Sequence, residues 1–372
     1  ASLREIIDEK AKQLEVANVI YQFTDGYDQL LEKYSNDYQN YDKYLEEITK
    51  NKINLLKHNC AFFEAKRGID YYDECKKDEL GKLKNIEKKY NILFRNKKRE
   101  IGNVVSCKTV IPTQYWAESI FPKEKNPLDK LWEIYFQITL ANVDDAIDKW
   151  NQRINNIQNR VKYLDLQQFK SLIFITRKSR LDVELVENHK WTGGCEITNT
   201  GIRYMPNFPT QEIFTAPKKT GITGIMCNTK PLCYGGRIID DFQLNFENGK
   251  VIDYYPKDNH SIIDEIINLD ESNHYPGEIA ILPGETEISK TCVVFQSTLL
   301  DENAACHLAL GCAYPCSINH ETKFEKEEFE KLGLNYSNYH IDVMFGDDSI
   351  TIQAISKNNE IKLLMENGEW RV

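Results

Sequence analysis

The first hundred residues contain no proline and only three glycines, whereas all eleven prolines of the chain lie from Pro112 onward. Because these two residues interrupt regular structure, their scarcity predicts long helices in the first part. There, one helix face carries residues at steps of three and four: Leu30, Tyr34, Tyr38, Tyr41, Leu45 and Ile48. This stripe indicates either the core of a helical hairpin or a face that docks on another domain or chain. We expect a helical N-terminal domain over residues 1–105.

The rest of the chain, residues 106–372, has a different pattern and predicts a second domain. Helical spacing of apolar residues continues to about residue 164, and from Ser171 onward short apolar or alternating runs are separated by turn-forming residues. Asn248-Gly249 and Asn367-Gly368 are typical of tight hairpin turns. We therefore expect an α+β fold, with a helical N-terminal part before a mainly antiparallel, β-rich domain that holds a few helices.

Charge and composition exclude several classes of partner. The 372-residue chain has a formal charge of −10, whereas a protein that binds nucleic acid through phosphates is usually basic, so we expect no nucleic-acid partner. The absence of a long apolar run and of an apolar core in residues 1–13 predicts a cytoplasmic protein without a membrane partner. None of the ten cysteines forms a C-x-x-C pair, so we expect reduced, structural thiols.

Two single glutamates of the second part are candidates for a polar site. Glu212 lies in a proline-bounded loop, 207–217, and by itself it is a weak signal because such side chains usually face solvent. Glu278 enters an apolar run, where a carboxylate is costly to bury unless it is paired or binds a cation.

Residues 298–311 add a glutamate and a histidine. The pattern predicts a short buried helix with a cap residue at each end: Asp301 or Asn303, and Gly311. His307 in its apolar body is then either a satisfied core residue or a metal ligand. Glu302 reaches His307 only if it lies in the turn before the helix.

The pair His340 and Asp342 flanks one apolar residue in a predicted strand. Side chains two positions apart on a strand point to the same face, so these two would project together while Ile341 and Val343 face the other side. An imidazole and a carboxylate on one face suit a divalent metal ion, although the pair also occurs by chance.

These stretches together supply four carboxylates and two histidines: Glu212, Glu278, Glu302, His307, His340 and Asp342. An excess of carboxylate over imidazole suits a pair of divalent ions that share one bridging carboxylate. Such a pair activates water and polarises a carbonyl.

From about residue 105 onward the chain resembles the aminopeptidase T, aminopeptidase S and aminopeptidase II family of metallo-aminopeptidases. The resemblance rests on N-F-P-T-Q-E-I-F-T-A-P at 207–217, P-G-E-I-A at 276–280, T-L-L-D-E-N-A-A-C-H-L-A-L-G-C-A-Y at 298–314 and N-Y-S-N-Y-H-I-D-V-M-F-G at 335–346. It implies that residues 106–372 form a metallopeptidase catalytic domain, and that the six residues named above bind two divalent ions. Zinc is the first expectation, with cobalt, manganese or magnesium as alternatives.

The resemblance also implies an activity and an assembly. We expect a hydrolase of the exopeptidase type, which cleaves the N-terminal peptide bond of peptides with a free N-terminus through a metal-activated water, and a homodimer. Glu212 or Glu302 is the candidate general base, and Tyr314 is expected to steady the oxyanion or the substrate, unless it is only a buried tyrosine.

Two departures from the family pattern leave alternatives open. Gln211 stands where the family usually has a first glutamate, and residues 1–105 look shorter and more helical than the family's N-terminal domain. The alternatives are a relative with another specificity, such as an amidase or dipeptidase, and an inactive protein with a structural or binding role.

Overall fold

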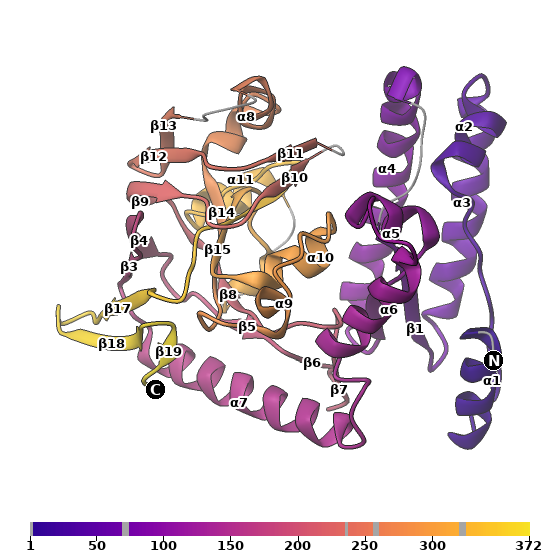
Figure 1. Cartoon of the computed structure of the whole chain (residues 1–372), viewed down its shortest axis with the longest axis horizontal. Coiled ribbons are helices and arrows are strands. Elements are labelled where there is room, and N and C mark those ends of the chain that lie inside the picture. The colour runs from indigo at the N-terminus through magenta and orange to yellow at the C-terminus, as the bar shows by residue number, and fades with distance from the viewer. Residues whose placement is uncertain (1–2, 69–73, 235–236, 256–259, 320–324) are drawn as a thin grey trace. The chain divides into compact units, whose positions relative to one another are not determined.

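The computed structural model describes residues 3–68, 74–234, 237–255, 260–319 and 325–372 (Figure 1). The chain forms two compact units, one of residues 1–54 with 70–97 and a larger one of residues 55–69 with 98–372. The sequence-based boundary at residue 105 stays a prediction. In the described part of the chain, no helix is both long and apolar enough to cross a membrane.

The smaller unit is built from helices: α1 (Leu3–Gln13), α2 (Tyr27–Tyr34), α3 (Tyr38–Leu55), the short 3-10 helix η1 (Glu74–Lys76) and α4 (Lys77–Ile101). Its core contains Leu30, Leu31, Tyr41, Leu80 and Leu83, with Tyr34, Tyr38 and Leu45 packed against them. The tyrosine-rich stripe is thus the interior of a helical unit, as the hairpin-core interpretation expected. Residues 35–37 divide the stripe between two helices.

The larger unit begins with a strand that the sequence analysis did not expect. Strand β1 (Ala61–Arg67) pairs in parallel with β2 (Val105–Ile111). Three helices follow, and two of them match the helical patterns read from the sequence: α5 (Gln114–Ile120), α6 (Pro127–Ile138) and α7 (Ala146–Gln167). Trp150, Ile154, Ile157, Val161 and Leu164 of α7 are buried, whereas Ile147, which the spacing places on the same face, is 78% exposed.

An antiparallel eight-stranded sheet has the order β13-β12-β9-β4-β3-β17-β18-β19. Its strands are β3 (Ser171–Ile175), β4 (Arg180–Leu185), β9 (Pro217–Cys227), β12 (Gln243–Glu247), β13 (Lys250–Tyr254), β17 (Thr351–Ile355), β18 (Ile361–Glu366) and β19 (Glu369–Trp370). The two Asn-Gly pairs lie in the turns of the hairpins β12–β13 and β18–β19, as predicted. All four of their residues have positive φ angles, which these turns require.

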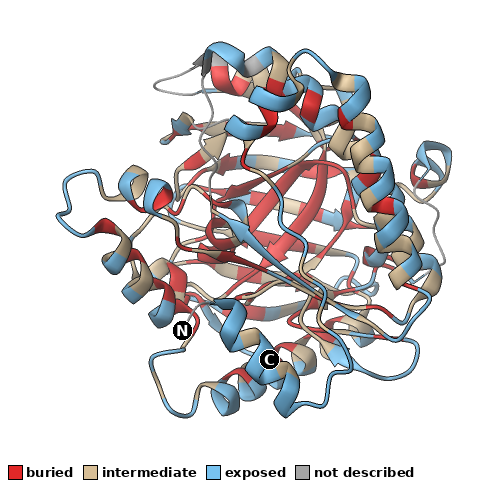
Figure 2. Cartoon of the chain, turned by 90° about the vertical axis from the view of Figure 1, so that its right-hand side faces the viewer, coloured by how far each residue is buried: buried red, intermediate tan, exposed pale blue. Residues whose placement is uncertain are grey.

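A five-stranded sheet, with the order β16-β15-β14-β8-β5, carries four of the candidate site residues: Glu278, His307, His340 and Asp342. Its strands are β5 (Thr192–Gly193), β8 (Ile213–Thr215), β14 (Pro276–Ile281), β15 (His307–Gly311) and β16 (His340–Met344). Apolar residues of both sheets, such as Phe174 and Ile352 from one and Ile279, Leu308 and Val343 from the other, share one core. Figure 2 shows these central strands as buried.

Smaller elements complete the larger unit. They are two two-stranded sheets, β6 (Glu196–Ile197) with β7 (Arg203–Tyr204) and β10 (Leu232–Tyr234) with β11 (Arg237–Ile239), and the helices α8 (His260–Ile267), η2 (Glu271–His274), α9 (Glu287–Lys290), α10 (Thr298–Asp301), η3 (Glu302–Ala304), η4 (Pro315–Ser317) and α11 (Lys326–Lys331). The chain is therefore α+β with mainly antiparallel sheets, as expected.

One expected helix is wrong. Residues 298–304 make only the short turns α10 and η3, and His307–Gly311 is a strand, not the body of a capped helix. Residues 308–311, L-A-L-G, alternate in size, and backbone pairing with β14 on one side and β16 on the other selects the extended form. Long-range pairing has overridden a local cap signal.

Candidate metal centre

The middle strands of the five-stranded sheet have two different faces. On β15, Leu308 and Leu310 belong to the core between the two sheets. Alternation along a strand therefore places His307 and Ala309 on the opposite face. The same argument holds on β16, where Val343 is in the core and Asp342 faces away from it. The site is thus built on the sheet face that turns away from the core.

Strand register places the candidate residues side by side on this face. Asp342 is opposite Ala309, and Ala309 is in turn opposite Glu278 on β14. His307 is opposite Met344. The alanine between the two carboxylates is fully buried and has a side chain of a single methyl group. Space above it remains available to the longer side chains on either side.

A first group consists of Glu212, Glu278 and His307, whose ligand atoms lie within 4.8 Å of one another. The Nε2 atom of His307 lies 3.3 Å from Oε2 of Glu212 and 3.4 Å from Oε1 of Glu278. All three side chains are buried. Glu212 reaches the group because it directly precedes β8, which pairs with β14.

A second group consists of Glu278, His340 and Asp342, again within 4.8 Å. The Nε2 atom of His340 lies 3.3 Å from Oδ1 of Asp342 and 3.6 Å from Oε2 of Glu278. Glu278 therefore belongs to both groups and turns one carboxylate oxygen toward each. A carboxylate placed in this way would contact a cation held in either group.

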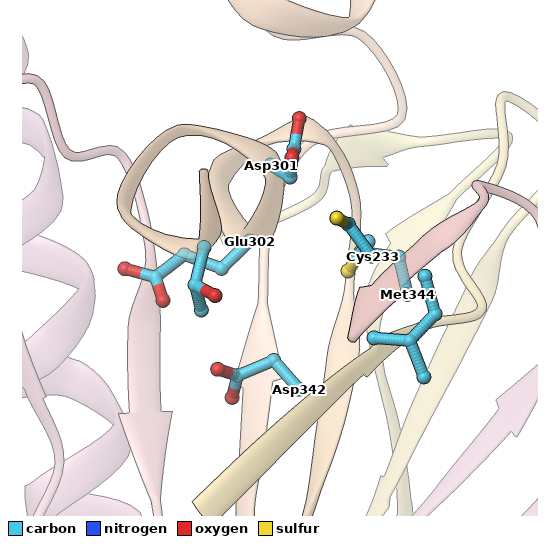
Figure 3. A pocket seen from close by; sticks show the side chains of 7 residues that line it. Cys233, Asp301, Glu302, Asp342 and Met344 are labelled. Carbon is cyan, nitrogen blue, oxygen red and sulfur yellow. The ribbon is translucent and has the colours of Figure 1, made fainter. Parts of the chain in front are cut away.

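The two remaining candidates lie next to these groups. Glu302, at the start of η3, lines a small hollow together with Asp342, and neither group includes it (Figure 3). The ring of Tyr314 lies 4.6 Å from the ring of His340 and 6.0 Å from that of Phe214. The structure thus brings the two histidines and three carboxylates into two triads, with Glu302 and Tyr314 at their border.

Both histidines are held so that Nε2 faces the carboxylates. Nδ1 of His307 lies 3.2 Å from the carbonyl oxygen of Ala305, and Nδ1 of His340 lies 2.8 Å from that of Cys312. A carbonyl oxygen can only accept a hydrogen bond, so each Nδ1 carries the proton. When the imidazole is neutral, this leaves Nε2 with a lone pair available to a metal ion.

Asn303 joins two segments of the site. It is fully buried, and its Oδ1 accepts a hydrogen bond of 2.7 Å from the backbone N–H of Gln211. Its Nδ2 donates to the carbonyl oxygen of Leu299 at 3.3 Å. Because Glu212 follows Gln211 and Glu302 precedes Asn303, this side chain fixes the spacing between the two glutamates.

The cluster holds an excess of negative charge. Burial raises the pKa of the Glu278 carboxyl, although His307 acts in the opposite direction. Burial, together with the charges of Glu212 and Asp342, raises the pKa of Glu302 well above its usual range. Burial alone would lower the pKa of His307, but its contacts with Glu212 and Glu278 outweigh burial and raise it. A cation bound here would compensate this charge.

One buried atom also fits a cation. Oε2 of Glu278 has no hydrogen-bond partner among the described residues, although the side chain is only 4% exposed. A buried carboxylate oxygen without a partner costs free energy, and a metal ion is a ligand that would satisfy it. Carboxylate oxygens and imidazole nitrogens are common ligands of divalent metals.

Comparison with known proteins gives the same indication. Residues 1–370 match the thermophilic metalloprotease (M29) family. The chain belongs to this family. The match extends the resemblance, which the sequence motifs traced from about residue 105, to nearly the whole chain. With the two triads, it supports binding of divalent metal.

Curated and solved relatives lie in the same group. The chain is 37% identical to Aminopeptidase 2 of Geobacillus stearothermophilus over 70% of its length, and 36% identical to Aminopeptidase AmpS of Bacillus subtilis (strain 168) over 68%. Each match covers 63% of the relative. The structure of wild-type AmpT from Thermus thermophilus superposes with a TM-score of 0.82 at 26% identity, covering 99% of this chain and 90% of that one.

The sequence motifs indicate the charged candidates of the site but not the supporting residues Ala309 and Asn303. Ala309 carried no chemical signal, yet it separates Asp342 from Glu278 in the sheet. Asn303 was considered only as a helix cap. The alternation in H-L-A-L-G was the signal that pointed to Ala309, because a small residue there shares a face with His307.

Proposed function

We propose that this chain is a metal-dependent aminopeptidase that hydrolyses the N-terminal peptide bond of peptides. The observation that supports this most strongly is the pair of triads that share Glu278, one oxygen toward each. This arrangement matches a two-metal hydrolase site, and the family and its named relatives are proteases and aminopeptidases.

Charge supports two ions rather than one. Glu212, Glu278, Glu302 and Asp342 carry four negative charges when ionised, and two protonated histidines would balance only half of them. Two divalent cations balance the carboxylates in full while the histidines stay neutral. We propose zinc as the metal, because a mixture of imidazole and carboxylate suits it, with cobalt, manganese and magnesium as alternatives.

The protein's own groups take defined roles in this proposal. When bound, the ions would polarise the substrate carbonyl and lower the pKa of a water molecule. We assign Glu302 as the group that accepts the water proton and returns it to the leaving amine, because it borders the triads without belonging to either. Glu212 then acts as a ligand. The hydroxyl group of Tyr314 donates a hydrogen bond to the developing oxyanion.

The finer assignments rest on the sequence patterns and on the resemblance. We propose peptides with a free N-terminus as substrates, a cytoplasmic location and a homodimer. We also propose that residues 106–372 are the catalytic domain and residues 1–105 an N-terminal domain.

Metal content and peptidase activity, measured on one preparation, test the proposal. We expect about two divalent ions per chain, and cleavage of free but not N-acetylated peptides. Asp342→Asn should lose metal and activity together, because it removes a ligand oxygen from the second triad. Asp148→Asn, which alters an exposed carboxylate on α7, is the matched control and should lose neither.

Other outcomes distinguish the alternatives. Two ions per chain with cleavage of amides or dipeptides only would indicate a different specificity. Two ions without cleavage of any substrate would indicate an inactive relative. A protein that binds no zinc, cobalt or manganese would refute the assignment of the site.

A further inference from the structure

Two polar residues of the motif N-Y-S-N-Y-H-I-D at 335–342 have no place among the candidate ligands. Asn335 and Ser337 lie between α11 and β16, five and three positions before His340. They are only 0% and 2% exposed. Burying a polar side chain costs free energy unless it is hydrogen-bonded, so the partners of these two residues indicate their role.

The side chain of Asn335 binds the carbonyl groups of two other segments. Its Nδ2 lies 2.6 Å from the carbonyl oxygen of Gly311, 2.7 Å from that of Ser272 and 3.0 Å from that of Tyr275. Nδ2 carries two hydrogens, so one of them is shared between two acceptors. Three acceptors around one atom also fix the orientation of the amide, because its oxygen could not take that place.

The first peptide group beside Cys312, which joins it to Gly311, is held at both ends. Its carbonyl oxygen, that of Gly311, accepts the hydrogen bond from Asn335. Its N–H, that of Cys312, donates to the carbonyl oxygen of Tyr339 at 2.7 Å. The segment before His340 therefore fixes this peptide group from two sides.

The second peptide group joins Cys312 to Ala313. The N–H of Ala313 donates to the main-chain carbonyl oxygen of Asn335 at 2.9 Å. Because a peptide group is planar and trans, fixing its N–H also fixes the direction of its carbonyl oxygen. This carbonyl oxygen, that of Cys312, is the acceptor for Nδ1 of His340 at 2.8 Å.

Ser337 holds the other strand of this arrangement. Its Oγ accepts the N–H of Tyr339 at 3.1 Å and donates to Oδ1 of Asn273 at 2.9 Å. The carbonyl oxygen of Tyr339 in turn lies so close to Gly311 that a Cβ there would be only 2.4 Å away, and Gly311 has a φ of +103°. A glycine is required at this position.

We infer that Asn335 and Ser337 are positioning residues for His340. Through the carbonyl group of Cys312 they fix the tautomer and the ring orientation of this histidine, so that Nε2 stays directed toward the carboxylates. They thereby set the affinity of the second triad for its ion. The inference rests on the proposed two-ion centre and concerns one of its two ions.

The first triad has a separate support. Nδ1 of His307 lies 3.2 Å from the carbonyl oxygen of Ala305, which is not part of the arrangement around Cys312. The ion of the first triad should therefore not depend on Asn335 or Ser337. This difference between the two ions distinguishes a positioning role from a general contribution to stability.

The test measures the two dissociation constants for zinc by chelator competition. Asn335→Ala should weaken the binding of one ion about 10–100-fold and leave the other unchanged. Ser337→Ala should act in the same direction by a smaller factor, and it decides the inference if Asn335→Ala does not fold.

Ser179→Ala is the matched control. Ser179 is also buried, and its hydroxyl group likewise accepts one backbone N–H and donates to one oxygen, both of Cys227. It lies between β3 and β4 of the eight-stranded sheet, which carries no proposed ligand. This variant should bind both ions as the wild type does.

A double variant tests whether the effect passes through His340. His340→Ala by itself should leave one tightly bound ion. Asn335→Ala added to it should not weaken that remaining ion, because a residue that acts through His340 then has nothing left to orient. A merely structural role of Asn335 would weaken the remaining ion in the double variant as well.

Two results would overturn the inference alone. One is wild-type affinity for both ions in Asn335→Ala and Ser337→Ala. The other is a weaker remaining ion in the double variant, which would indicate an action through Tyr275 and Glu278, or through the fold as a whole. A wild-type protein that binds fewer than two ions would instead overturn the proposed centre and this inference with it.

Discussion

Replacing Glu278 by glutamine tests the central feature of the site, because this residue alone belongs to both triads. Glu278→Gln keeps the shape of the side chain but exchanges one ligand oxygen for an amide nitrogen that cannot bind a cation. The variant should therefore lose at least one ion. Without metal it should be more stable than the wild type, because it removes one of four crowded carboxylates.

The size of the effect follows from linkage. An ion present at 100 times its dissociation constant stabilises the folded state by about 2.7 kcal/mol, so two ions contribute roughly 5 kcal/mol. The larger unit holds about 290 residues. Its unfolding entropy near 60 °C is then about 0.6 kcal/mol per kelvin, and metal should raise the Tm of the wild-type protein by about 9 °C.

For Glu278→Gln the expected rise with metal is about 4 °C or less, corresponding to one ion or none. In the metal-free state, removal of one carboxylate from a cluster with four carboxylates and two histidines should raise stability by about 1–3 kcal/mol, or the Tm by roughly 2–5 °C. Calorimetry of chelator-treated samples measures the change of Tm without metal, and calorimetry of metal-loaded samples measures the rise of Tm with metal. Metal content is measured in parallel.

A matched control is Glu285→Gln, which makes the same exchange at an exposed position seven residues further on. It should behave as the wild type does in both states. The reasoning would be refuted if Glu278→Gln gained as much stability from metal as the wild type, or if its metal-free form were less stable by several kcal/mol.

Two further predictions concern residues without ligand atoms of their own. Ala309→Val adds two methyl groups between Asp342 and Glu278. The metal content should therefore fall below one ion per chain, while the circular dichroism spectrum stays unchanged. Two retained ions would contradict this prediction. Asn303→Ala removes the acceptor of the Gln211 N–H, so the distance between Glu212 and Glu302 is no longer fixed by this hydrogen bond. The affinity for metal, measured by chelator competition, should fall about 10–100-fold. An unchanged affinity would show that the hydrogen bond has no positioning role.

Local patterns predicted much of this fold. The helix over α7 and the two Asn-Gly hairpins follow from spacing and turn chemistry within a few residues, and the structure confirms them. The pair His340 and Asp342 was readable as a shared strand face for the same reason. Each of these features depends on backbone geometry that a short segment carries by itself.

The error at residues 298–311 has the opposite cause. The carboxylate of Asp301 accepts the backbone N–H groups of Phe295 and Ser297, which precede it, and it caps no helix after it. His307–Gly311 has no strong preference for helix or strand, and pairing with β14 and β16 determines that it is a strand. The partners of that pairing lie about thirty residues away on either side, beyond the range of any local pattern.

The sequence by itself determined the candidates for the site: four carboxylates and two histidines within apolar stretches, where burial is costly unless a cation compensates them. Only the tertiary structure decided how these side chains are distributed over the two triads. The register of three strands gives Glu278 to both triads and places Ala309 as the spacer between Glu278 and Asp342. Register depends on hydrogen bonds between distant segments, so a linear pattern identifies candidate ligands but not their geometry.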